Sequence, residues 1–108
     1  MTAKEYVQQV KKIETLIKNQ KLEIKQAERL SINTSYLQNS IKQLEKTRQE
    51  IISNIERLTE PEYDVLHRVY VQGQTFYEVA SERDITYRCV TSIHGRALKR
   101  LETFLKTE

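Results

Sequence analysis

Apolar positions in the first half of the chain recur at alternating intervals of three and four residues, the period of one face of an α-helix. Two runs follow this rule. The first comprises Val7, Val10, Ile13, Leu16, Ile17, Gln20, Ile24, Ala27 and Leu30, and the second comprises Leu37, Ile41, Leu44, Arg48, Ile51, Ile55 and Leu58. Glycine and proline are absent up to Leu58, and Lys, Gln, Glu and Leu, all strong helix formers, dominate. The pattern predicts long helices.

The second run does not continue the heptad register of the first. The break coincides with residues 31–35, whose short polar side chains compete for backbone hydrogen bonds and favour turns. We therefore predict one helix over residues 2–30 and a second over 34–58. A turn between them would give an antiparallel hairpin, whereas a helical connection would give a single rod of roughly 80 Å. The hairpin is favoured because the break in register falls on the turn-prone residues.

Polar residues interrupt both apolar runs, at Gln20 and Arg48. A polar residue on such a stripe costs stability but can fix register or partner number. An isolated pair of helices also has a thin core. The stripes are therefore expected either to pack in a core with the rest of the chain or to bind a partner, including a second copy.

A third helix is predicted over residues 60–71. Thr59 with Glu62 forms a capping box, and Pro61 is tolerated in a first helical turn because its missing N–H is not needed there. Gly73 is suited to the left-handed conformation that ends a helix.

Residues 75–101 carry two further helix starts separated by a turn. Thr75 with Glu78 forms a second capping box, and Thr86 can cap the helix that follows. Ile85 is placed to fill the corner between the helices. The apolar spacing of the first of them is carried by Phe76, Val79 and Ala80. The arrangement predicts a helix-turn-helix.

The last helix is amphipathic. Its predicted buried stripe comprises Val90, Ile93, Ala97, Leu98, Leu101 and Phe104. Its predicted outward face comprises Tyr87, Arg88, Thr91, Ser92, Gly95, Arg96 and Lys99. That face offers hydrogen-bond donors, acceptors and positive charge, but no carboxylate.

Composition and charge fit an all-α fold in two parts. The 108 residues are 31% charged with two glycines and one proline, which favours helix over sheet. We divide them into a helical hairpin or coiled-coil region, 1–58, and a helix-turn-helix domain, 59–108. Residues 59–85 carry 2 Lys and Arg against 6 Asp and Glu, whereas residues 86–108 carry 5 against 2. The final helix is therefore the basic part of an acidic half, which suits an approach to phosphates.

Other chemistry finds little support in the sequence. Cys89 is the only cysteine, so an internal disulfide is impossible, and its place beside Val90 predicts a small buried hydrophobe. His67 and His94 lack partners at metal-ligand spacing and are expected to be polar surface residues. No catalytic motif, cofactor motif, long apolar run or signal peptide occurs. We expect a cytoplasmic protein that is not an enzyme, binds no metal or cofactor and contacts no membrane.

Residues 59–104 resemble the fourth conserved region of bacterial sigma factors, which reads promoter DNA. The resemblance is carried by Leu58, Thr59, Glu62, Val65, Leu66, Val69, Tyr70, Gly73, Gln74, Thr75, Glu78, Val79, Ala80, Ile85, Thr86, Val90, Ile93, His94, Arg96, Ala97, Leu98 and Leu101. With its lysine-rich helical first half, the whole chain is similar to phage and prophage regulators of the RinA and ArpU type, which activate late operons.

The resemblance implies roles for individual residues. Those near the start of the last helix would face base edges in the major groove: Tyr87, Arg88, Thr91 and Ser92. Others would contact DNA phosphates: Thr75, Thr86, Arg96, Lys99 and Arg100. Family members often carry larger charged or amide residues at the positions of Thr91 and Ser92, so the sequence preference should differ.

The expected function is sequence-specific binding of double-stranded DNA by a transcription regulator. Its helices would contact RNA polymerase or form a homodimer. One alternative is a DNA-packaging subunit like the small terminase, although its helix-turn-helix usually comes first. A second alternative is a module that binds polymerase without touching DNA.

Overall fold

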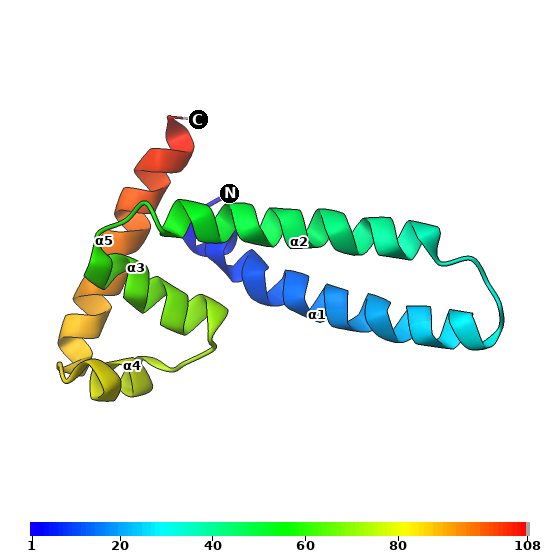
Figure 1. Ribbon diagram of the computed structural model, residues 1–108. Coiled ribbons are helices and arrows are strands. Elements are labelled where there is room, and N and C mark those ends of the chain that lie inside the picture. The colour runs from blue at the N-terminus through cyan, green and yellow to red at the C-terminus, as the bar shows by residue number, and fades with distance from the viewer. Residues whose placement is uncertain (108) are drawn as a thin grey trace.

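The computed structural model describes residues 1–107, which are helical apart from short connections. The helices are α1 (Ala3–Arg29), α2 (Ser35–Ile55), α3 (Glu60–Leu66), a π-helical segment (His67–Val71), α4 (Phe76–Arg83) and α5 (Tyr87–Lys106). In Figure 1, α1 and α2 lie side by side, and α3, α4 and α5 gather at the end of this pair where α1 begins. The all-α prediction is confirmed for the described residues. Within them, no helix combines the length and the apolar character that a membrane span requires.

The chain reverses direction between α1 and α2. Ser31 has a φ of 56°, in the left-handed region, and the N–H of Ile32 donates to the carbonyl of Ala27 at 2.9 Å. The side chain of Asn33 accepts from the N–H of Ser35 at 2.8 Å. These contacts close a turn, so the chain forms the antiparallel hairpin and not the single rod.

An ion pair explains the polar residue on the α2 stripe. The guanidinium of Arg48 donates to the Glu14 carboxylate of α1 through both Nε, at 3.2 Å, and a terminal nitrogen, at 3.1 Å. Both nitrogens donate to the same carboxylate oxygen, so the pair links α1 and α2 at this level of the hairpin. Toward the tip of the hairpin, larger apolar side chains become exposed, including Leu22, Leu30, Ile32 and Tyr36.

One hydrophobic core joins the two predicted parts of the chain. From residues 1–58 it takes Ala3, Val7, Val10, Ile13, Ile51, Ile55 and Leu58, and from the second part it takes Leu66, Tyr70, Ala97 and Leu101. The base of the hairpin therefore packs on α3 and α5, so buried apolar contacts join the hairpin to the C-terminal helices in addition to the covalent chain.

A second, smaller core holds α4 against α3 and α5. It comprises Val65, Val79, Ala80 and Val90, with Phe76, Ile85, Val69 and Ile93 packed around them. Asp84 follows α4 with a φ of 56°, and Ile85 packs on this core as predicted. The core fixes the angle at which α5 leaves the turn.

The end of the second helix and the type of the third differ from the prediction. The second helix ends at Ile55 and not at Leu58, because the N–H groups of Arg57 and Leu58 donate to carbonyls three residues back and the chain tightens into a turn. Leu58 is still buried, so its place on the apolar stripe reflects core packing outside the helix. The third helix spans 60–71 as predicted, but its last five residues are π-helical.

Candidate nucleic-acid interface

The start of α5 is fixed by its cap. The hydroxyl oxygen of Thr86 accepts from the N–H of Cys89 at 3.1 Å. Val90, Ala97 and Leu101 are completely buried on the inner side of α5. With one face so firmly packed, the opposite face of α5 is presented to solvent at a defined angle.

The four residues predicted to face DNA bases lie on this outward side. Tyr87 is 44% exposed, Arg88 and Ser92 are exposed, and Thr91 is half-buried. The Thr91 hydroxyl donates to the Arg88 carbonyl at 2.8 Å. Its hydrogen is therefore already used within the helix, which leaves its oxygen as an acceptor and its methyl group for apolar contact.

Three cations of the outward face have no acidic partner. None of the ion pairs formed within residues 1–107 involves Arg88, Arg96 or Lys99. Between Tyr87 and Leu101, α5 has no acidic residue of its own. These cations are therefore free to bind an anion from outside.

Arg100 lies in a different environment from these three. Its Nε is 3.3 Å from the carboxylate of Glu62, which is only 4% exposed. Glu62 also takes part in the cap at Thr59. Arg100 thus neutralises a buried carboxylate and ties α5 to the start of α3, a contact that competes with the phosphate contact predicted for it.

Thr75 and Thr86 use their side chains as caps. The Thr75 oxygen accepts from the N–H of Glu78 at 3.2 Å, and the Glu78 carboxylate accepts from the N–H of Thr75 at 3.1 Å. The capping bonds use each threonine oxygen as an acceptor, so its hydroxyl hydrogen and backbone N–H groups of the first helical turn are what each region offers to a phosphate.

Exposed aromatic rings connect the starts of α4 and α5. Tyr77 is 73% exposed, yet its ring lies 4.6 Å from the ring of Tyr87, centroid to centroid. Phe76 lies 6.0 Å from Tyr87 on the buried side. Phe76 and Tyr77 together orient the ring of Tyr87. The sequence did not identify Tyr77 as a neighbour of Tyr87, because the two residues lie on different helices.

His94 is half-buried, which corrects the expectation of a surface histidine. Its Nε2 is 2.8 Å from the hydroxyl of Tyr70, which the π-helical segment carries, and its ring lies 4.8 Å from Phe76. Burial, and secondarily the charge of Lys4, lowers the pKa of His94. His94 therefore acts as a neutral packing and hydrogen-bonding residue where several helices meet.

An acidic cluster occupies another part of the C-terminal helices. Asp64 accepts from Arg68 at 2.8 Å and from Arg83 at 2.6 Å, and these arginines also pair with Glu82 and Glu60 respectively. Burial alone would raise the pKa of Asp64, but the hydrogen bonds from both arginines lower it. The basic residues of segment 59–85 are thus engaged with its acidic ones.

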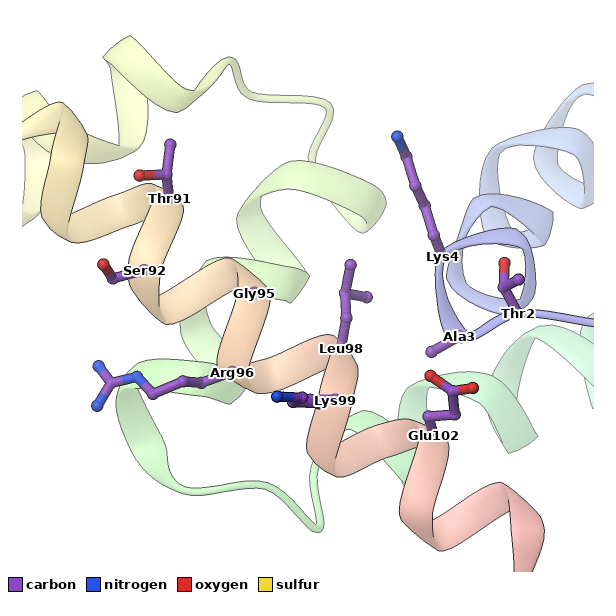
Figure 2. A pocket seen from close by; sticks show the side chains of 10 residues that line it. All are labelled: Thr2, Ala3, Lys4, Thr91, Ser92, Gly95, Arg96, Leu98, Lys99 and Glu102. Atoms are coloured by element: carbon purple, nitrogen blue, oxygen red, sulfur yellow. The ribbon is translucent and has the colours of Figure 1, made fainter.

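A surface hollow separates the start of α1 from the outward face of α5 (Figure 2). Thr2, Ala3 and Lys4 line it from α1, and the α5 side is lined by Thr91, Ser92, Gly95, Arg96, Leu98, Lys99 and Glu102. Lys4 was missed as a site residue, because no local pattern shows that α1 begins beside α5.

Cys89 is exposed, contrary to the prediction that it is buried. It lies one position before the buried Val90 and so falls outside the apolar stripe. In the described part of the chain, no three His, Cys, Asp or Glu side chains are grouped so that they could hold a metal ion.

Comparisons of this chain with protein-family models, with curated proteins and with solved structures found no match.

Proposed function

We propose that this protein is a sequence-specific DNA-binding transcription regulator, similar to the late-operon regulators of phages and prophages of the RinA and ArpU type. In this proposal α4 and α5 act as a helix-turn-helix like that of sigma-factor region four. The start of α5 enters the major groove, where Arg88 is suited to bidentate contact with guanine.

The observation that carries the proposal is the outward face of α5. Among residues 1–107, Arg88, Arg96 and Lys99 have no acidic partner, whereas Arg68, Arg83 and Arg100 are all engaged with carboxylates elsewhere. Opposite charges three or four residues apart stabilise a solvated helix, but α5 has no acidic residue between Tyr87 and Leu101. A capped helix that presents unbalanced positive charge beside polar side chains is suited to bind DNA. The charge would attract the phosphates, and the polar side chains could form hydrogen bonds with the base edges.

Partners other than DNA are also part of the proposal. The exposed apolar residues of the hairpin tip would support a homodimer, and the acidic side of α3 and α4 would face RNA polymerase. A dimer would place two recognition helices on half-sites about one helical turn of DNA apart.

Gel-shift titration of the DNA flanking its own coding sequence, against random DNA of equal length, tests the base-reading step. Arg88→Ala is expected to lose most of the preference for specific DNA, by roughly tenfold or more if one bidentate contact is lost. Lys99→Ala should instead weaken binding to both DNAs, with a shallower salt dependence. Equal retention of wild type and Arg88→Ala on specific and random DNA would contradict the assignment.

The packaging alternative predicts a different assembly. A small-terminase-like protein would form a large ring, which light scattering distinguishes from a monomer or dimer. A polymerase-binding module would retain polymerase in a pull-down but leave no footprint on DNA.

A further inference from the structure

The start of α1 is held in a fixed position beside α5. Ala3 is 2% exposed and shares a core with Ala97 and Leu101. Thr2 and Glu5 close a capping box at the same point. The backbone that carries Lys4 is therefore anchored at the edge of the hollow, although Lys4 lies far from α5 in the sequence.

Positive charge stands on both sides of this hollow. Lys4 lines the hollow from α1 and Lys99 lines it from α5, whereas Figure 2 shows the Arg96 side chain pointing away from Lys4, on the far side of α5. Lys4, like Arg96 and Lys99, takes part in no ion pair within residues 1–107. An anion in the hollow would be attracted from both sides.

Gly95 lies on α5 between these cations and leaves the helix backbone uncovered. A Cβ added to Gly95 would meet no atom within 4 Å, so packing inside the protein does not require glycine there. Glycine is also unfavourable within a helix. What glycine would permit at this position is close approach of another molecule to the helix backbone.

The opposite end of the hollow is acidic. Glu102 lines it, and its carboxylate lies 3.6 Å from the ammonium of Lys106. A phosphate would be repelled from this end, so the favourable position for an anion is near Gly95 and Lys4.

We propose that the hollow is a phosphate subsite, in which a phosphodiester of bound DNA lies over Gly95 between Lys4 and Lys99. This inference rests on the proposed function and adds to it that the N-terminal helix contributes directly to DNA binding. Lys4 would then supply a backbone contact that the C-terminal helices alone cannot make.

Salt-dependent binding of duplex DNA to the full chain tests the role of Lys4. Lys4→Ala is compared with Lys18→Ala, which removes the same charge from an exposed position further along α1. Loss of one phosphate contact should reduce the slope of log affinity against log salt by about 0.9. We expect this for Lys4→Ala and an unchanged slope for Lys18→Ala.

Two further variants test the position of the phosphate. Gly95→Ala should weaken DNA binding while raising the midpoint of urea unfolding, because alanine favours the helix but its methyl group occupies the place of closest approach. Glu102→Gln should strengthen binding to all sequences, because it removes a negative charge from the other end of the same hollow.

The outcomes separate the subsite from the function on which it rests. If Lys4→Ala matches Lys18→Ala while Lys99→Ala still reduces the slope, the subsite is wrong and DNA binding stands. If Gly95→Ala binds as tightly as wild type, no phosphate lies over Gly95. If wild type binds no DNA, both proposals are overturned.

Discussion

Individual side chains on α5 differ more in role than their charges suggest. Arg96 and Lys99 form no ion pair with the part of the chain that the structure describes, whereas Arg100, only one residue beyond Lys99, pairs with the buried Glu62. The amphipathic pattern correctly predicted the buried Val90, Ala97 and Leu101 of α5, but it misplaced Cys89 and His94. It could not predict the ion pair, because Glu62 lies on another helix and is brought to Arg100 only by the fold.

The lowered pKa of a single side chain, His94, predicts that the stability of the protein depends on pH. Its pKa is lowered in the folded protein from an ordinary value of 6.5, so the unfolded chain binds more protons below that pH. The free energy of unfolding should therefore decrease as the pH falls through about 6.5, and His94→Gln should flatten this dependence.

Urea unfolding between pH 7 and 5 measures the effect of His94. Asp64, whose pKa is lowered from 3.8, also loses its stabilising contribution on acidification, but only at lower pH. An equally steep loss of stability in His94→Gln over pH 7 to 5 would show that another group is responsible.

Among the helices, the starts were predictable and some of the ends were not. Capping boxes at Thr59 and Thr75 and the cap at Thr86 are present as the sequence indicated, because each depends on residues three positions apart. The predicted end of the second helix was wrong, because the buried Leu58 continues the apolar period although the helix has already ended at Ile55. The π-helical segment has no local signal.

The cap of α5 gives a prediction at the scale of one element. Thr86→Ala removes the oxygen that accepts from the Cys89 N–H and should lower the free energy of unfolding by about 1 kcal/mol. Thr86→Ser keeps that oxygen and serves as the matched control. Urea midpoints that are the same for the two variants would show that the cap contributes nothing measurable.

Across the whole molecule, the hairpin and the C-terminal helices share a core that the sequence did not reveal. Periodicity predicted that stripes on both parts are buried, but not that Val10 and Leu101 belong to one cluster. Lys4 was missed for the same reason. Contacts between residues so far apart leave no spacing pattern in a single sequence.

Leu101→Ala tests this shared core. The cavity it leaves should cost about 2–5 kcal/mol of unfolding free energy. Because Leu101 packs in the same cluster as Val7 and Val10, amide hydrogen exchange should accelerate in the first turns of α1 as well as in α5. Faster exchange confined to residues 59–107 would show that the two parts unfold independently.

The central claim is that the outward face of α5 reads DNA in the major groove. Methylation protection of guanine N7 by the full chain, on the DNA that it binds most tightly, tests this directly because N7 lies in that groove. Wild type is expected to protect guanines within a short site, and Arg88→Ala is expected to lose protection at one position while Lys99→Ala weakens it throughout. DNA binding without any N7 protection, or protection that is identical in wild type and Arg88→Ala, would contradict the claim.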